Sequence, residues 1–533
     1  MAAGVSALYG GYLWLVWALS VASLGLSAAI LSKHSGSYPS SEWHGVLIQN
    51  VFAWAWNGLF LTILAPASFV LSHTIFFGAA SQFFITFVGW LQGIVGLGSI
   101  TGLTRKYGYP EHTQLYRAYL GVGWTATFLL MFAALWAGFH YISGQATAAP
   151  PRKEEEPSQL VIEKTKSPKT IPPASQLVFG RTFTDHMLCI PWNSQKGWGA
   201  PKIQPYGPLQ LDPSSTVLHY APTLFEGLKA YKGKDGVPRL FRPDKNMERM
   251  NRSAGRLAFP TFTGEHLTTL IKKLVEIDSA WVPTEPGTSL YIRPTMIGTQ
   301  AGLGVGASTD VLLFVICSPV GPYYSTGFKP VKLYATTKDV RAWPGGTGGY
   351  KLGSNYAAGV VPQQQAAALG YQQILWLFGR EHRLTEVGTM NLFLSLSSPS
   401  SSPSVEIVTP PLDDMILPGV TRDSILSLLR DHASGKKKLE GLPDNLTVSE
   451  RNITMSDVVK AEKEGTLLEM FGSGTAAIVS PIDGIGYEDR LIKVPVGSDG
   501  LGDIARVMLR EIVGRQTGEI PSEWSVTVNS RSL

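Results

Sequence analysis

The chain has 533 residues, which is too long for one typical domain, so two or three domains are expected. Its formal net charge of +5 is small for this length and forms no basic stripe, which argues against a nucleic-acid partner. The only cysteines, Cys189 and Cys317, lie far apart without metal-ligand spacing, which argues against a disulfide scaffold and a metal site.

Residues 1–142 are far more apolar than the rest of the chain. Charged side chains are absent from residues 1–32, 46–104 and 118–151. Because about 20 mainly apolar residues form one helix that crosses a bilayer, these stretches predict about four transmembrane helices. Residues 1–142 are therefore interpreted as an all-α transmembrane bundle with membrane lipid as a partner. A second interpretation is that two neighbouring reading frames have been joined.

Residues 143–174 predict a flexible linker. They are rich in alanine, proline, lysine, glutamate and serine and show no apolar periodicity. From about residue 175 the composition becomes that of an ordinary globular protein.

The part after the linker mixes strand and helix patterns. Apolar runs predict strands at residues 289–294 and 310–318, and helical periodicity marks residues 266–280, 422–432 and 504–513. The serine-rich residues 395–404 predict a hairpin loop between two strands. These patterns together predict the α+β class.

The most informative segment reads AWPGGTGGYKLGSNY, at residues 342–356, and places Lys351 after a glycine-rich, flexible loop. Read alone, the simpler interpretation is a surface lysine, because the glycines match neither the Rossmann nor the Walker spacing. Further motifs in a fixed order change this interpretation. The upstream motifs are LHYAPTLFEGLKAYKG at 218–233, RPDKNMERMNRSAGRL at 242–257 and TSLYIRP at 288–294, and the downstream ones are TEVGTMN at 385–391, LPGVTRD at 417–423 and FGSGTA at 471–476.

In this order the motifs resemble the branched-chain amino-acid aminotransferases, which are fold-type-IV enzymes that use pyridoxal 5′-phosphate. The resemblance covers residues 175–528. It implies a two-lobed α+β domain, with a small lobe at residues 175–340 and a large lobe at residues 341–533, and a homodimer. It also implies a ping-pong transfer of the amino group of L-leucine, L-isoleucine or L-valine to 2-oxoglutarate.

The resemblance assigns the cofactor-binding residues one by one. Lys351 is the Schiff-base lysine and the general base and acid between the substrate Cα and the cofactor C4′. Glu386 supplies the anion that an electron-accepting pyridinium ring requires, and Tyr356 donates to the phenolate oxygen. The phosphate dianion is costly to bury unpaired, and its expected partners are Arg249, Val420, Thr421 and Thr475. Only the register of the motif selects Arg249 over its neighbours Arg242, Arg252 and Arg256.

The substrate side must accept both an aliphatic amino acid and glutamate, so an apolar pocket with one cation is expected. The resemblance implies Arg293 as that cation. The residues implied to line the pocket, Arg293 included, are Tyr220, Phe225, Lys229, Tyr291, Arg293, Thr389 and Ala476. The aromatic residues among them are equally consistent with a hydrophobic core.

Two other functions are compatible with the motifs. One is a different fold-type-IV enzyme that acts on D-amino acids or simple amines, although Tyr291 and Arg293 argue against it. The other is a membrane scaffold whose aminotransferase domain is inactive. The joint presence of the four cofactor partners argues against that, and they are Lys351, Glu386, Tyr356 and Arg249. The apolar N-terminus predicts a multi-pass membrane localisation, with the aminotransferase domain in the cytosol beside its metabolites.

Overall fold

The computed structural model describes residues 156–321, 329–398 and 404–528. The transmembrane bundle predicted at residues 1–142 lies outside these residues, as does the start of the predicted linker. Across the described ranges, no helix combines the length and the apolar character needed to cross a bilayer.

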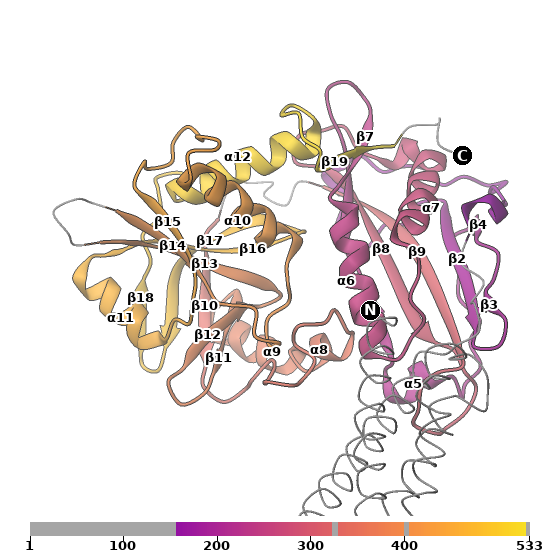
Figure 1. Cartoon of the computed structure of the whole chain (residues 1–533), viewed down its shortest axis with the longest axis horizontal. Coiled ribbons are helices and arrows are strands. Elements are labelled where there is room, and N and C mark those ends of the chain that lie inside the picture. The colour runs from indigo at the N-terminus through magenta and orange to yellow at the C-terminus, as the bar shows by residue number, and fades with distance from the viewer. Residues whose placement is uncertain (1–155, 322–328, 399–403, 529–533) are drawn as a thin grey trace, which may run out of the picture. The chain divides into compact units, whose positions relative to one another are not determined.

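Within the described ranges the chain forms two sheets, and Figure 1 labels strands of both. The first has ten strands in the order β1-β4-β2-β9-β8-β6-β7-β19, with β3 paired to β2 and β5 to β8. All of these pairs are antiparallel except β1 with β4. The strands are β1 (Val161–Ile162), β2 (His186–Asn193), β3 (Gly197–Trp198), β4 (Lys202–Pro205), β5 (Thr223–Phe225), β6 (Leu228–Lys232), β7 (Pro238–Phe241), β8 (Ser289–Gly298), β9 (Asp310–Val320) and β19 (Ser525–Thr527).

The second sheet has nine strands in the order β12-β11-β10-β17-β16-β13-β14-β15, with β18 paired to β17. Because β12 also pairs with β13, the six strands from β12 to β13 form a closed ring. The strands are β10 (Val331–Thr336), β11 (Gln373–Phe378), β12 (Arg383–Val387), β13 (Met390–Ser397), β14 (Val405–Thr409), β15 (Leu446–Glu450), β16 (Leu467–Gly474), β17 (Ile478–Tyr487) and β18 (Arg490–Lys493).

Helices pack on both sheets. The helices are α5 (Thr216–Tyr220), α6 (Pro243–Arg256), α7 (Gly264–Ile277), α8 (Ser354–Ala357), α9 (Val360–Ala368), α10 (Val420–Ala433), α11 (Met455–Glu464) and α12 (Asp503–Thr517). The short 3₁₀ helices are η2 (Pro157–Gln159), η3 (Ala174–Gln176) and η4 (Ser279–Trp281). Helix α7 shows why these helices form, because its apolar residues recur three and four positions apart and build one buried stripe. That stripe joins the core of the first sheet and consists of Leu267, Leu270, Ile271, Leu274 and Val275.

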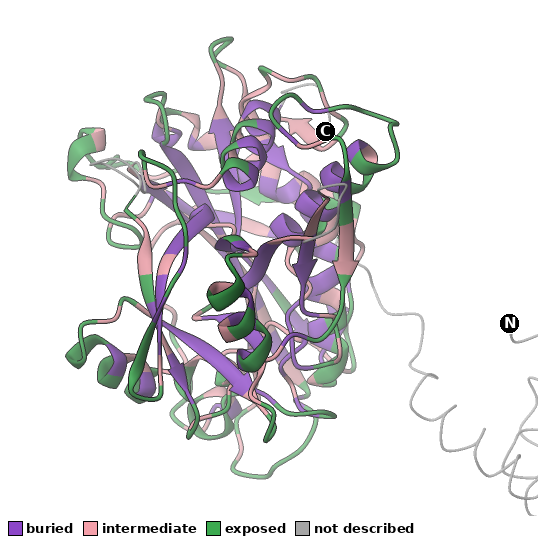
Figure 2. Cartoon of the chain, turned by 90° about the vertical axis from the view of Figure 1, so that its left-hand side faces the viewer, coloured by how far each residue is buried: buried purple, intermediate pink, exposed green. Residues whose placement is uncertain are grey.

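Buried residues are concentrated where helices meet the sheets, and exposed residues on outer helix faces and loops (Figure 2). Helices α6 and α7 share one hydrophobic core with the first sheet. Helices α10 and α12 form a second core with β13 and β16, and α11 forms a third with the closed ring. The site described below lies where α6 meets loops of the second sheet.

The elements predicted from periodicity are confirmed. Strands β8 and β9 contain the predicted residues 289–294 and 310–318, and helices α7, α10 and α12 coincide with the predicted helices to within a few residues. The serine-rich segment joins the antiparallel pair β13 and β14, and its residues 399–403 lie outside the described residues.

The structure differs from the predicted linker and lobe ranges at three places. Residues 161–162, inside the predicted linker, form β1 at the sheet edge, and the Thr165 N–H donates to Nε2 of His186 at 2.9 Å. Two residues are enough to form this strand, because the edge strand β4 offers unpaired backbone groups. Strand β10 of the second sheet begins at Val331, before the predicted boundary at residue 340, and β19 returns to the first sheet.

Candidate active site

The backbone of Lys351 is held on both sides by the first sheet unit. Its N–H donates to Oγ of Ser253 on α6 at 3.0 Å, and its carbonyl accepts from the Phe225 N–H on β5 at 3.1 Å. The Gly353 N–H donates to the Thr223 carbonyl at 3.0 Å, which extends this backbone pairing. Lys351 can therefore move its side chain while its Cα stays fixed.

The side chain of Lys351 lies beside two aromatic residues that the sequence assigned to the site, Tyr356 and Phe225. Its Nζ donates to the Tyr356 hydroxyl at 3.0 Å and lies 4.7 Å from the centre of the Phe225 ring. The rings of Phe225 and Tyr356 are 4.9 Å apart between centroids. The amine is thus oriented by one hydroxyl and one aromatic face and has no carboxylate within ion-pair distance in the described part of the chain.

Two of the glycines before Lys351 have a geometric reason to be glycine, Gly348 in its packing and Gly345 in its backbone conformation. A Cβ on Gly348 would lie 2.4 Å from the Met415 carbonyl oxygen, so no larger residue fits there. Gly345 has a φ of +75°, which favours glycine. The Gly349 carbonyl accepts from Nη2 of Arg252 on α6 at 2.6 Å. The loop is therefore bonded on one side to α6, through Arg252, and on the other to the segment between β14 and α10, through the Asp414 carbonyl.

Glu386, on β12, is a buried carboxylate with several partners. Its Oε2 lies 2.8 Å from Nε of Arg341, and its Oε1 accepts from the Leu417 N–H at 2.9 Å and from Nδ2 of Asn391 at 3.4 Å. Burial raises the pKa of Glu386, and the Arg341 guanidinium opposes that rise. Arg341 was absent from the sequence predictions.

Arg249, on α6, is also paired with a buried carboxylate. Its Nε and Nη2 donate to the two oxygens of Glu226 at 2.7 and 2.8 Å. Its Nη1 donates to the Pro418 carbonyl at 3.0 Å. Burial alone would raise the pKa of Glu226, but the charge and hydrogen bonds of Arg249 outweigh burial and hold that pKa below its usual range. Because Pro418 lies two residues before Val420, the hydrogen bond to its carbonyl places Arg249 next to the start of α10.

The start of α10 offers backbone donors. Val420 and Thr421 are its first two residues and are nearly buried. The first N–H groups of an α-helix have no partner within the helix, and the helix dipole makes them attractive to anions. Because Pro418 ties Arg249 to this end, one guanidinium and one helix N-terminus are available to the same anion.

Lys229, on β6, reaches the turn between β16 and β17. Its Nζ donates to the Ala476 carbonyl at 2.8 Å, and burial lowers the pKa of Lys229 to about 8. Thr475 and Ala476 occupy this turn and are half-buried. Thr389 lies in the exposed turn between β12 and β13.

Arg293 is a cation without an acidic partner among the described residues. Its Nη2 donates to the Tyr291 hydroxyl at 3.0 Å, and its guanidinium lies 4.7 Å from the centre of the Phe225 ring. Its Nε is buried and has no hydrogen-bond partner within the described ranges. Phe179, which the sequence predictions did not include, packs edge-on against Tyr291 at 4.9 Å between centroids.

Tyr220 makes its hydrogen bond and its ring contact away from Lys351. Its side chain is 46% exposed, and its hydroxyl donates to the Leu303 carbonyl at 2.5 Å. Leu303 and Val305 are 65% and 83% exposed, and Leu218 is exposed as well. These four exposed residues lie on α5 and on the loop between β8 and β9, and Tyr220 and Leu303 are in contact; they are called the exposed apolar group.

The sequence predictions missed Glu226, Arg341 and Phe179. Glu226 carries a signal, because an acidic residue inside the apolar run TLFEGLKAY needs a buried partner. Arg341 directly precedes the lysine motif, but nothing in the sequence pairs it with Glu386. Phe179 lies in a segment too short to show periodicity.

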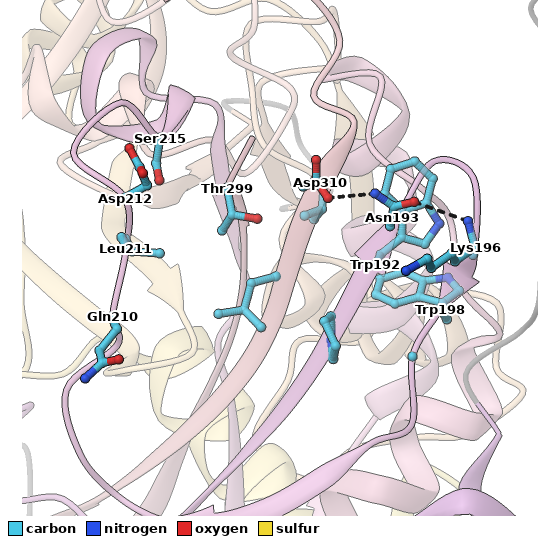
Figure 3. A pocket seen from close by; sticks show the side chains of 15 residues that line it. Trp192, Asn193, Lys196, Trp198, Gln210, Leu211, Asp212, Ser215, Thr299 and Asp310 are labelled. Atoms are coloured by element: carbon cyan, nitrogen blue, oxygen red, sulfur yellow. Dashed lines mark hydrogen bonds between the residues drawn. The ribbon is translucent and has the colours of Figure 1, made fainter. Parts of the chain in front are cut away.

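A separate cavity of about 550 Å³ lies beside β2, β3 and β9 (Figure 3). Figure 3 shows Asn193 bonded to Asp310 beside Trp192 and Trp198, with Asp212 and Ser215 farther along the cavity. None of the predicted site residues lines it.

Comparisons with known proteins agree with the resemblance. Residues 223–485 match the family model of the class IV aminotransferases. The mitochondrial branched-chain-amino-acid aminotransferase of Saccharomyces cerevisiae is 52% identical over 385 residues, which are 72% of this chain and 95% of that protein. The cytosolic enzyme of the same yeast is 52% identical over 373 residues, which are 70% of this chain and 97% of that protein.

The predicted multi-pass membrane localisation is wrong by this comparison. The two yeast relatives are named as mitochondrial and cytosolic enzymes, and neither name refers to a membrane. The prediction came from the apolar composition of residues 1–142, which lie before the part that resembles known enzymes and outside the described residues. The comparisons therefore give no support to the predicted membrane bundle or to a lipid partner.

The fold agrees with the family as well. The branched-chain amino acid aminotransferase of Thermobaculum terrenum, in its PLP form, matches with a TM-score of 0.50 at 20% identity, over 65% of this chain and 98% of that one. This likeness confirms the α+β fold predicted for the part of the chain after the linker. With 52% of the aligned residues identical to each of the two yeast relatives, over 95% and 97% of their lengths, the chain belongs to the branched-chain-amino-acid aminotransferases, within the class IV aminotransferases.

Proposed function

We propose that the chain transfers the amino group of L-leucine, L-isoleucine or L-valine to 2-oxoglutarate with pyridoxal 5′-phosphate as cofactor. The observation that carries the proposal is the position of Lys351. Its amine lies 3.0 Å from the Tyr356 hydroxyl on a backbone fixed by β5 and α6. The names of the yeast relatives support the choice of amino acids.

The donor set fits this cofactor. The aldehyde requires an amine, the phenolic oxygen a hydroxyl donor, and the ring nitrogen a buried carboxylate. The phosphate requires a guanidinium and the N–H groups of a helix N-terminus. Lys351 would hold the aldehyde, Tyr356 the phenolic oxygen and Glu386 the ring nitrogen. The phosphate would be held by Arg249, Val420, Thr421 and Thr475.

The chemistry divides between cofactor and protein. Pyridoxal 5′-phosphate supplies, when bound, an aldehyde that bonds amino groups and a ring that accepts an electron pair. Nζ of Lys351 would take the proton from the substrate Cα and deliver it to the cofactor C4′, with its approach set by the Tyr356 hydroxyl. Glu386 keeps a negative charge beside the ring nitrogen, and Arg341 stabilises that charge.

The substrate residues explain how one pocket could accept two unlike amino acids. Phe225, Tyr291 and Phe179 offer apolar surface to an aliphatic side chain. Arg293 offers a guanidinium without an acidic partner in the described ranges to the side-chain carboxylate of glutamate. Lys229 fixes the turn at Ala476, whose N–H would meet the α-carboxylate.

The proposal includes a homodimer of two-lobed subunits. The lobes are the small lobe proposed for residues 175–340 and the large lobe proposed for residues 341–533, except that β10 joins the large lobe and β19 joins the small lobe. A second subunit would cover the exposed apolar group of Leu218, Tyr220, Leu303 and Val305, and burying such a group is a common reason for association.

The test uses the full chain loaded with pyridoxal 5′-phosphate and given L-leucine without an acceptor. The visible absorption band should fade while about one equivalent of 2-oxo acid per cofactor is released, and 2-oxoglutarate should restore the band and release glutamate. Lys351→Ala should lose the reaction, whereas Lys436→Ala, at an exposed lysine, should keep it.

Two outcomes would overturn the proposal. A band that responds to D-alanine or to a simple amine but not to L-leucine would show a different fold-type-IV transaminase. A folded protein that binds no cofactor would favour an inactive domain.

A further inference from the structure

Glu226 is the most deeply buried carboxylate near Lys351, and the proposed chemistry does not use it. Its side chain has no exposed surface, and Arg249 is 7% exposed. Both of its oxygens accept from Arg249. Its Oε2 also accepts from Nδ2 of Asn246 on α6 at 2.8 Å and from the Gly227 N–H at 3.2 Å.

Stability alone does not explain this ion pair. Taking two charges out of water costs about as much as their attraction returns, so an apolar pair of similar size is often as stable. A buried pair of this kind instead fixes the direction of its groups, because each hydrogen bond has a narrow range of angles. The function of Glu226 should therefore be sought in how Arg249 is oriented.

The hydrogen bonds leave Arg249 with a defined pair of free donors. An arginine has five N–H groups, and three of these are bonded, two to Glu226 and one to the Pro418 carbonyl. Among the described residues, one N–H on Nη1 and one on Nη2 remain without a partner, and N–H groups on these two nitrogens can be directed at two oxygens of a phosphate. Pro418 places them beside the start of α10 at Val420.

Helix α6 holds this arrangement in register with Lys351. Asn246, Arg249 and Ser253 lie three and four residues apart, so they share one helix face. Asn246 bonds Glu226, Arg249 presents the free donors, and Ser253 bonds the Lys351 backbone. Any rotation of the guanidinium would move its donors relative to the lysine.

We propose that Glu226 is a positioning residue, which locks the Arg249 guanidinium so that its two free N–H groups form a fork for the phosphate group of the cofactor. This inference rests on the proposed function. A positioning role and a role in net charge make different predictions for phosphate binding, because Glu226 cancels the charge of Arg249. The pair attracts a dianion through the direction of its N–H groups and not through a net positive charge.

Glu226→Gln separates the two explanations. The substitution raises the charge of the site by one, so a role in charge alone predicts tighter binding of pyridoxal 5′-phosphate. A positioning role predicts weaker binding, by on the order of 10- to 100-fold, because the glutamine amide cannot accept both Arg249 donors. Pyridoxal lacks the phosphate, and its binding should stay unchanged.

The measurement is the dissociation constant of each ligand for the full chain without cofactor, from absorbance titration. Glu248→Gln, at an exposed residue of the same helix, is the matched control and should bind as the unmodified protein does. If Glu226→Gln does not fold, Asn246→Ala decides, because it removes the amide support and leaves the ion pair. It should weaken pyridoxal 5′-phosphate binding several-fold and leave pyridoxal binding unchanged.

The outcomes are distinct. Unchanged or tighter binding of pyridoxal 5′-phosphate, or equal loss for both ligands, overturns the inference and leaves the proposed function standing. If the unmodified protein does not prefer pyridoxal 5′-phosphate to pyridoxal, there is no phosphate site, and the inference and the proposed function both fall.

Discussion

Nε of Arg341 lies 2.8 Å from a carboxylate oxygen of Glu386, and the two side chains are 6% and 2% exposed. Burial favours the neutral acid at Glu386, whereas the proposed chemistry requires the anion. Arg341 is the largest of the opposing influences, and the Leu417 N–H, Lys351 and Arg249 also favour the anion. The proposed partner of the ring nitrogen thus depends on a residue that need not touch the cofactor.

Replacing Arg341 should move the pH dependence of catalysis. In Arg341→Met the pKa of Glu386 rises further, so the acidic limb of the kcat profile should shift to higher pH, and kcat at pH 7 should fall by on the order of tenfold. Arg341→Lys retains a charge and should shift the limb less. A limb at the same pH in Arg341→Met as in the unmodified enzyme would contradict this role.

Replacing Arg293 should separate the two substrate classes. Arg293→Met removes the guanidinium that has no acidic partner among the described residues, so kcat/KM for glutamate should fall by on the order of 10- to 100-fold. The value for L-leucine should change only a few-fold, because its side chain is uncharged. Steady-state kinetics with each donor tests this, and an equal loss for both donors would refute it.

Replacing Lys229 should affect substrate binding through the turn at Ala476. Lys229→Met leaves the Ala476 carbonyl without its donor, so KM for L-leucine should rise about tenfold, with a smaller change in kcat. Lys232→Met is the matched control, because Lys232 lies on the same strand and donates to the Ser279 carbonyl instead. The same rise in KM for both variants would show a general effect on β6.

Glu469 should make stability depend on pH. Burial raises the pKa of Glu469 to about 7, although its carboxylate accepts from the Ile504 and Ala505 N–H groups at the start of α12. Because this folded-state pKa lies above the unfolded value of 4.5, the folded protein binds more protons between these pH values. The free energy of unfolding should therefore fall as the pH rises through this window, by at most about 3 kcal/mol.

Thermal unfolding of Glu469→Gln and of the unmodified protein at pH 5 and pH 8 measures this contribution. The glutamine variant should lose less stability between the two pH values. Glu464→Gln, at an exposed position on α11, should behave as the unmodified protein does. If Glu469→Gln keeps the full pH dependence, other groups cause it.

The sequence predicts the groups that come from long motifs, because motif order fixes their identity. Lys351, Tyr356 and Phe225 lie together, and Arg249 and Val420 lie on either side of Pro418. Their carboxylate and guanidinium partners are different. Glu226 and Arg341 bond residues far away in the chain, and such pairs depend on which loops the sheets bring together.

Composition and periodicity had similar limits. Apolar stripes predict α7 and the strand runs of β8 and β9, because burial imposes a regular spacing. The ring closed by β12 and β13 has no such signal, since it depends on pairing across a tight turn. Tyr220 was assigned by its motif alone, and motif position does not tell whether a residue faces its own subunit's lysine.

The return of β19 to the first sheet has a consequence for protein synthesis. Residues 525–527 pair with β7, and Val528 belongs to the core that α6 and α7 share with the first sheet. The ribosome makes these residues after every strand of the second sheet. The first sheet therefore stays incomplete, with the edge of β7 unpaired, until the residues of the second sheet and β19 have been made.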